Sequence, residues 1–173
     1  MHGSGSTSWA LVQPSARRRL WELRSGDEAV ASLEIPVFRS TALAETPDRR
    51  LRIERQGGLR AGYAVIDARD GSEVARLRAE RGRRVLELDG LTAEWKNLRR
   101  GRGFAFVDPE DMPLLTAKVR TGLVRSSGEL ELDPRLSEHQ ATVAALLACY
   151  LLIRRNEQAA SGAAGAGAAS VGS

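Results

Sequence analysis

The chain has 173 residues, of which 42% are apolar and 28% are charged, a balance typical of one folded domain. Cys149 is the single cysteine, which excludes an internal disulfide, and with only His2 and His139 beside it no conventional zinc site is expected. The formal net charge of +4 is too small for a dedicated nucleic-acid binder, but it permits weak attraction to anionic surfaces.

The sequence predicts one domain, residues 9–155, between two segments that lack packing residues. Residues 1–8 are small and polar, so we expect a flexible arm without a secretory signal. The second segment is 156–173, in which residues 158–173 are almost entirely Ala, Gly and Ser. Such residues bury too little apolar surface to offset the entropy lost on ordering, so we predict a disordered tail.

Apolar and polar residues alternate in short runs from Trp9 to Leu132, as in strands with one buried face. Leu51 and Ile53, for example, alternate with Arg52 and Glu54. Turn-forming sequences separate the runs: Ser25-Gly26-Asp27, Gly57-Gly58, Asp70-Gly71, Arg81-Gly82, Asp89-Gly90 and Ser127-Gly128. The pattern predicts a mainly β fold of about twelve short antiparallel strands.

One helix, at about 138–155, is predicted after these strands. Ser137 and Gln140 fit a capping box at its start. The thirteen residues of the stretch 141–153 carry no charge, and Arg154 and Arg155 follow where they would face the carbonyl end of the helix. A helix that is apolar on every side is either enclosed by protein or inserted in lipid.

Length favours enclosure of this helix. Thirteen residues span about 20 Å, whereas a bilayer core of about 30 Å needs about 20 residues. We therefore predict a closed or nearly closed antiparallel β-barrel that encloses the hydrophobic C-terminal helix. The residues expected to pack inside it are Val143, Leu146, Leu147, Tyr150 and Leu151. The alternative is a membrane-tethered protein with 141–153 as a short tail anchor.

This order of elements, short strands followed by the uncharged stretch 141–153 and by Arg154 and Arg155, resembles the tubby C-terminal-like superfamily. That superfamily includes the tubby proteins, the phospholipid scramblases and the LURP-one-related proteins, and the compact length is most similar to the LURP-one-related and small bacterial members. The resemblance covers residues 9–155. It implies a barrel with a central helix and a binding function rather than catalysis.

Tubby domains bind phosphoinositide headgroups through basic residues, and scramblases carry calcium-binding and palmitoylated segments. This sequence has no cysteine cluster before its barrel and no acidic loop with the spacing of a calcium site. The resemblance therefore does not transfer scramblase activity, and it assigns no phosphoinositide-binding residue to any position here.

The segment 76–103 holds nine basic residues against four acidic ones. Guanidinium groups suit phosphates, and cations on neighbouring loops attract anionic membranes. The candidate anion-binding residues are Arg81, Arg83, Arg84, Arg99, Arg100 and Arg102. The competing interpretation is that these arginines are spread over the barrel as edge protection.

Other candidate chemistry has simpler structural interpretations. We expect His139 in the first helical turn, Cys149 as an inert core thiol, and the acidic segment Asp108–Asp111 as a turn between strands rather than a metal site. Phe104 and Phe106 alternate with apolar residues, so this strand needs a cover on both faces, from a partner, a second copy or the N-terminal arm. No catalytic residue, metal or cofactor is predicted.

These observations predict a non-enzymatic binding module whose Arg-rich loops contact anionic phospholipid headgroups or an acidic partner. We expect a cytoplasmic protein, peripheral at membranes, that is a monomer or weak dimer. Nucleic-acid binding is disfavoured because no exposed aromatic platform is evident. A protein–protein adaptor without lipid affinity is a further alternative.

Overall fold

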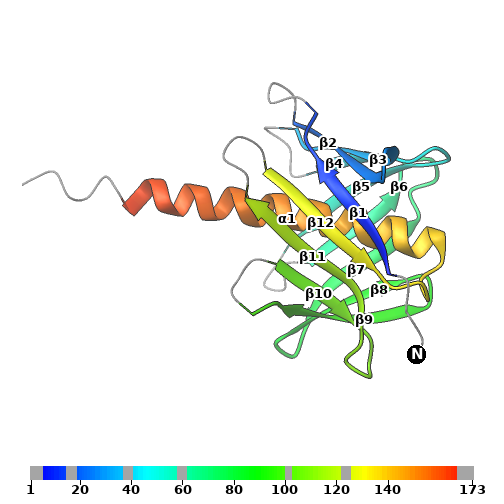
Figure 1. Ribbon diagram of the computed structural model, residues 1–173. Coiled ribbons are helices and arrows are strands. Elements are labelled where there is room, and N and C mark those ends of the chain that lie inside the picture. The colour runs from blue at the N-terminus through cyan, green and yellow to red at the C-terminus, as the bar shows by residue number, and fades with distance from the viewer. Residues whose placement is uncertain are drawn as a thin grey trace, which may run out of the picture.

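The computed structural model describes residues 6–14, 19–36, 41–57, 62–99, 103–121 and 126–166. Its twelve strands form a closed barrel in which each strand pairs antiparallel with its neighbours in sequence and β12 pairs with β1 (Figure 1). The elements are β1 (Thr7–Val12), β2 (Leu20–Ser25), β3 (Glu28–Glu34), β4 (Thr41–Glu45), β5 (Arg50–Gln56), β6 (Gly62–Asp67), β7 (Glu73–Glu80), β8 (Arg83–Leu88), β9 (Leu91–Asn97), β10 (Gly103–Val107), β11 (Pro113–Thr121), β12 (Ser126–Leu132) and α1 (Glu138–Ala166). The predicted antiparallel β-barrel is confirmed.

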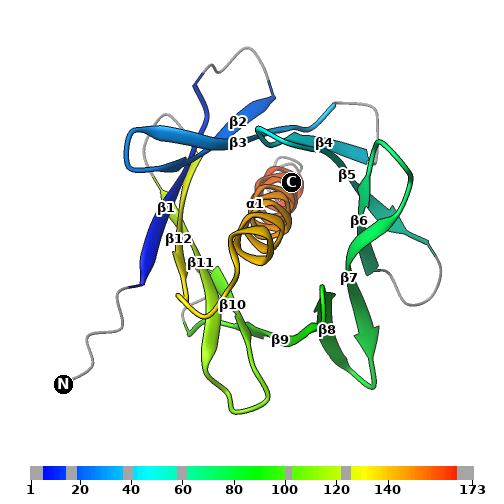
Figure 2. The ribbon, with the colours of Figure 1, turned by 90° about the vertical axis from the view of Figure 1, so that its right-hand side faces the viewer.

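Helix α1 runs through the middle of the barrel, with strands on every side of it (Figure 2). No residue from Val143 to Ile153 is more than 6% exposed. This group contains all five predicted packing residues, and Leu146 and Leu147 are 0% exposed. The prediction of an enclosed apolar helix is therefore confirmed. No helix in the described part of the chain combines the length and apolarity needed to cross a membrane.

The start of α1 is fixed by the predicted capping box. The backbone N–H of Gln140 donates to Ser137 Oγ at 3.1 Å, and the Ser137 N–H donates to Gln140 Oε1 at 3.1 Å. The Gln140 side-chain amide also donates to the carbonyl oxygen of Asp89, in the turn between β8 and β9. These bonds fix the helix start to the rim of the barrel.

The end of α1 differs from the prediction, because the helix continues past Arg155 to Ala166. Residues 156–166, which the sequence predicted as part of a disordered tail, are helical, and residues 167–173 lie outside the described part. Arg154 and Arg155 consequently lie within the helix rather than at its carbonyl end. Alanine is the strongest helix former, and extending a helix that is already nucleated is far easier than starting one. Composition alone suggested disorder because it took no account of the preceding helix.

Glycines in the barrel wall allow close approach at two positions. A Cβ at Gly62 of β6 would lie 2.5 Å from the carbonyl oxygen of Leu77 on β7, so a side chain there would clash with the neighbouring strand. A Cβ at Gly103 of β10 would lie 2.1 Å from the carbonyl oxygen of Ala117 on β11, which is a severe clash. Gly103 therefore sets the spacing of β10 and β11 at the rim.

Strand β10 is buried on both faces within the single chain. Trp95 of β9 stacks on Phe104 with ring centroids 3.7 Å apart, and Phe106 packs edge-on against the same indole. On the opposite face, Ala105 is paired with Lys96 and Thr116 of the flanking strands and is 4% exposed. The apolar pattern of this strand therefore requires neither a partner nor a second copy.

The antiparallel order sends successive connections to alternate ends of the barrel. We call the end at which α1 begins the proximal end; it carries the connections that follow even-numbered strands. The opposite end, the distal end, carries the connections that follow odd-numbered strands, and α1 leaves the barrel there (Figure 1).

The enclosed helix predicts that Leu147→Asp prevents folding, because it places an unpaired charge in the apolar interior. The same change at Ala160, which is exposed on α1 outside the buried stretch, should fold normally. Soluble yield and thermal melting followed by circular dichroism check both variants. A soluble Leu147→Asp protein with an unchanged melting temperature would contradict the enclosed helix.

Close approach of β10 and β11 predicts that Gly103→Ala destabilises the barrel by about 1–3 kcal/mol, a typical cost of overpacking. Gly57→Ala is the matched control, since a Cβ there meets no atom within 4 Å. The control should leave the unfolding free energy unchanged or slightly raised. Urea unfolding of the two variants measures the difference, and equal midpoints would refute the close approach.

Candidate functional site

Arginine is concentrated at the distal end of the barrel. The described residues of the connections at this end include Arg19, Arg81 and Arg99 and no acidic residue. Strand ends and α1 add further arginines at the same end, together with Glu34, Glu80 and Glu157. We call the described set the distal arginines: Arg19, Arg55, Arg81, Arg83, Arg84, Arg99, Arg154 and Arg155.

The structure brings four of the six predicted anion-binding residues to this end. Arg81 lies in the turn between β7 and β8, and Arg83 and Arg84 begin β8. Arg99 follows β9, which pairs with β8, so the two groups occupy neighbouring connections. Arg100 and Arg102 lie outside the described residues. The alternative of arginines scattered over the wall does not hold for these four.

Local geometry exposes these side chains. Arg81 and Gly82 have φ angles of 47° and 82°, as in the two-residue turns that match the twist of a hairpin. The guanidinium of Arg84 lies 5.4 Å from the centroid of the Trp95 ring, and Arg83 lies 3.4 Å from Glu94. The side chains of Arg81 and Arg99 form no ion pair or hydrogen bond within the described part of the chain.

Helix α1 contributes two more cations to the distal end. Arg154 Nε donates to the Tyr150 hydroxyl at 3.3 Å, and its Nη1 donates to Glu157 Oε2 at 3.3 Å. Glu157 also accepts from Arg19, so this carboxylate links the helix to the residue that precedes β2. Arg155 donates to the carbonyl oxygen of Gly103 at 3.4 Å. These contacts attach α1 to the distal rim.

A hollow of about 400 Å³ opens beside the helix at this rim. Arg55 and Tyr63 line it from β5 and β6, and Tyr150 and Arg154 line it from α1. The Tyr63 and Tyr150 rings meet edge-to-face with centroids 5.6 Å apart. Two guanidinium groups and one carboxylate, that of Glu157, face this hollow, which gives it a net positive charge.

Basic residues on the outer wall are paired with carboxylates on the same or a neighbouring strand or turn. Arg76 lies 2.7 Å from Glu73, and Arg78 lies 2.7 Å from Glu87. Lys96 pairs with Asp111. Exposed pairs of this kind contribute little to stability, but they neutralise the wall. The structure therefore separates the sequence cluster 76–103 into a paired wall group and the distal arginines.

Charge has the opposite sign at the proximal end. The six connections there, all fully described, contain eight acidic residues and three arginines. The acidic residues are Asp27, Asp48, Asp70, Asp89, Asp108, Glu110, Asp111 and Asp133, and the arginines are Arg49, Arg69 and Arg135. Glu138 adds another carboxylate at the start of α1. The barrel is therefore polarised along its axis, acidic at the proximal end and basic at the distal end.

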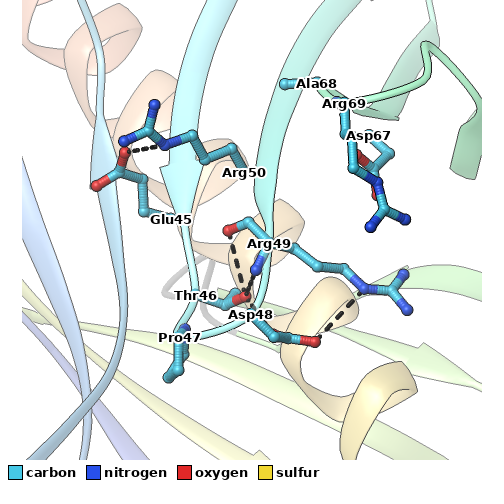
Figure 3. A pocket seen from close by; sticks show the side chains of 9 residues that line it. All are labelled: Glu45, Thr46, Pro47, Asp48, Arg49, Arg50, Asp67, Ala68 and Arg69. Atoms are coloured by element: carbon cyan, nitrogen blue, oxygen red, sulfur yellow. Dashed lines mark hydrogen bonds and ion pairs between the residues drawn. The ribbon is translucent and has the colours of Figure 1, made fainter.

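A hollow of about 590 Å³ at the proximal end is lined by paired charges (Figure 3). Arg50 Nε lies 2.9 Å from Glu45 Oε1, and Arg49 Nε lies 3.5 Å from Asp48 Oδ2. Among the described residues, no group of three or more His, Cys, Asp or Glu side chains is placed to hold a metal ion. Cys149 is 0% exposed, and burial raises the pKa of its thiol far above the usual value.

The acidic segment Asp108–Asp111 forms the predicted turn, between β10 and β11. Asp108 Oδ1 accepts hydrogen bonds from the backbone N–H groups of Glu110 at 3.1 Å and Met112 at 2.8 Å. Its Oδ2 accepts from Arg135 Nη1 at 2.8 Å, which joins this turn to the segment before α1. The Met112 hydrogen bond, followed by those of Arg135 and Glu110, holds the pKa of Asp108 below its usual value.

Sequence reasoning identified the arginine clusters but missed their segregation. The signal was present in the order of the turns, since Asp-Gly turns at 70–71 and 89–90 alternate with the Arg-Gly turn at 81–82. Finding it requires knowing whether each connection follows an odd-numbered or an even-numbered strand. That in turn requires an exact count of the strands. Arg55 was missed because it lies within a strand rather than a loop.

Comparisons with family models, curated proteins and solved structures found no match to this chain. The interpretation of the distal arginines consequently depends on the geometry described above.

The bonds of Asp108 predict a pH-dependent contribution to stability. Because folding lowers its pKa, the contribution is fully present above the usual carboxyl pKa of 3.8 and is lost as the pH falls through the lower, folded-state pKa. Asp108→Asn should therefore melt several degrees below the parent protein at neutral pH, and the gap should begin to close below about pH 4 and disappear below the folded-state pKa of Asp108.

Asp27→Asn is the control for this prediction, because Asp27 is exposed and has no side-chain partner within the described part. It should melt with the parent protein at both pH values. Differential scanning calorimetry across the acid range provides the comparison, and a gap for Asp108→Asn that persists in acid would contradict the assignment.

Proposed function

We propose that this protein is a non-enzymatic module that binds anionic membrane surfaces through the distal arginines. The observation that carries the proposal is the axial polarity of the barrel, in which the distal arginines lie at one end and the acidic connections at the other. Two of these arginines, Arg81 and Arg99, form no ion pair or hydrogen bond within the described part of the chain. The tubby-like order of elements is consistent with a binding function, although it assigns no ligand-binding residue.

Segregated charge is not what fold stability requires. Like charges at one end of the barrel repel each other. On the wall, by contrast, Arg76 and Arg78 are neutralised by nearby carboxylates. The distal end retains Arg81 and Arg99 without a partner in the described part. Their exposure is better explained by an external anion than by an internal role.

Arginine is well suited to that external anion. Its planar guanidinium donates two parallel hydrogen bonds to a phosphate or carboxylate, and it remains charged at any physiological pH. Several arginines at one rim act together on a surface of many anions, because each cation near an anionic leaflet contributes about 1 kcal/mol. Binding of this kind needs no pocket of fixed shape.

The alternative of a tail anchor is disfavoured by burial. The uncharged stretch 141–153 is enclosed by the barrel and is already removed from water. Inserting it in lipid would require the barrel to open and to expose its own apolar lining. We therefore propose peripheral binding with the barrel intact.

Co-sedimentation with vesicles tests the proposal. The parent protein should pellet with vesicles of phosphatidylserine and phosphatidylcholine, remain soluble with phosphatidylcholine alone, and be released by high salt. The double variant Arg81→Gln/Arg99→Gln should lose about 2 kcal/mol of binding, roughly 30-fold in affinity. Its melting temperature should not change, because neither side chain has a partner in the described part.

The matched control is Arg50→Gln/Arg69→Gln at the proximal end, which has the same net charge as the test variant. It should bind like the parent protein if position rather than total charge decides affinity. Equal losses in the two double variants would refute a distal binding surface. Absence of pelleting by the parent protein would favour an acidic protein partner instead, and salt-resistant binding to neutral vesicles would favour insertion.

A further inference from the structure

Helix α1 passes the distal rim of the barrel at Arg155 and Glu157. Arg155 donates to the carbonyl oxygen of Gly103 at the start of β10, and Glu157 contacts Arg19 just before β2. Beyond these residues the helix emerges from the barrel and projects away from it (Figure 1). The last helical residues therefore lie outside the barrel, at the end that carries the distal arginines.

The projecting segment is uncharged. The helix from Gln158 to Ala166 contains no acidic or basic residue, and Gln158 to Ser161 are exposed. At 1.5 Å per residue its nine residues extend about 14 Å beyond the rim. Since the polar interfacial layer of a bilayer is only about 5–8 Å thick on each side, a surface that reaches the distal arginines must also accommodate this segment.

The polarity of the barrel determines which orientation an anionic surface favours. Such a surface attracts the distal arginines and repels the acidic residues of the proximal connections. The barrel axis then aligns with the surface normal, and α1, which runs along the barrel (Figure 2), aligns with it. A sideways approach would present the paired and nearly neutral wall.

We propose that the barrel docks end-on on an anionic bilayer, with the projecting turns of α1 entering through the headgroup layer and the proximal end facing away. This inference rests on the proposed function and adds to it the bound orientation and the element that enters the interface. The distal arginines supply the attraction. The uncharged helix end enters without burying an unpaired charge, and its small side chains displace little lipid.

Site-specific fluorescence tests this orientation. Cys149 is buried, so a polarity-sensitive nitrobenzoxadiazole probe can be attached to Ser161→Cys in the full chain. Met112→Cys is the control, because Met112 is 56% exposed and lies at the proximal end. The vesicles contain phosphatidylserine, phosphatidylcholine and a lipid with a nitroxide on its headgroup. The probe at position 161 should shift to the blue and be quenched several-fold, and the probe at position 112 should do neither.

The outcomes separate the inference from the proposed function. If the labelled proteins pellet with the vesicles but the probe at position 161 is unchanged, or both probes are quenched equally, end-on docking is overturned and surface binding stands. If neither protein pellets, both proposals fall.

A charge placed in the projecting segment provides a second readout. Ala160→Asp should weaken vesicle binding several-fold, whereas Ala68→Asp in the exposed turn between β6 and β7 should change it little. Equal effects of the two substitutions would overturn the orientation.

Discussion

The uncharged stretch 141–153 must be kept from water on every side, and the whole architecture satisfies that requirement. A sheet open at one edge would leave part of the helix exposed, whereas a closed barrel covers the full circumference. Each strand supplies inward apolar residues in a two-residue period. Helix and barrel therefore provide each other's core, and neither could bury its apolar face alone.

Enclosing the helix also determines where function can reside. The interior is filled by α1 and by the side chains that surround it, including Tyr150 and Cys149, so the barrel holds its own helix rather than a ligand. The outer wall is largely neutralised by ion pairs such as Arg78 with Glu87. The two ends are left as the surfaces with distinct chemistry.

Those ends differ because the chain is a simple meander. Successive connections alternate between the ends, so a sequence that alternates acidic and arginine-rich turns becomes a barrel with one acidic and one basic end. The helix is oriented consistently with this polarity, since its positive N-terminal end and Glu138 lie at the acidic end. The same orientation carries the uncharged end of α1 out through the arginines. The arginines that would attract an anionic surface and the projecting end of α1 therefore lie at the same end of the barrel.

Local patterns were sufficient for the class of fold, the enclosed helix and its capping box, because alternation and turn chemistry favour antiparallel strands and the length of the all-round apolar stretch favours enclosure over insertion in lipid. Sequence alone did not place the helix end, since whether Gln158 to Ala166 stay helical depends on the nucleated helix before them. It identified Arg81, Arg83, Arg84 and Arg99 but not that they share a rim with Arg19, Arg55 and Arg154. Which residues meet at one end depends on the number and pairing of strands, and only the closed tertiary structure decides both.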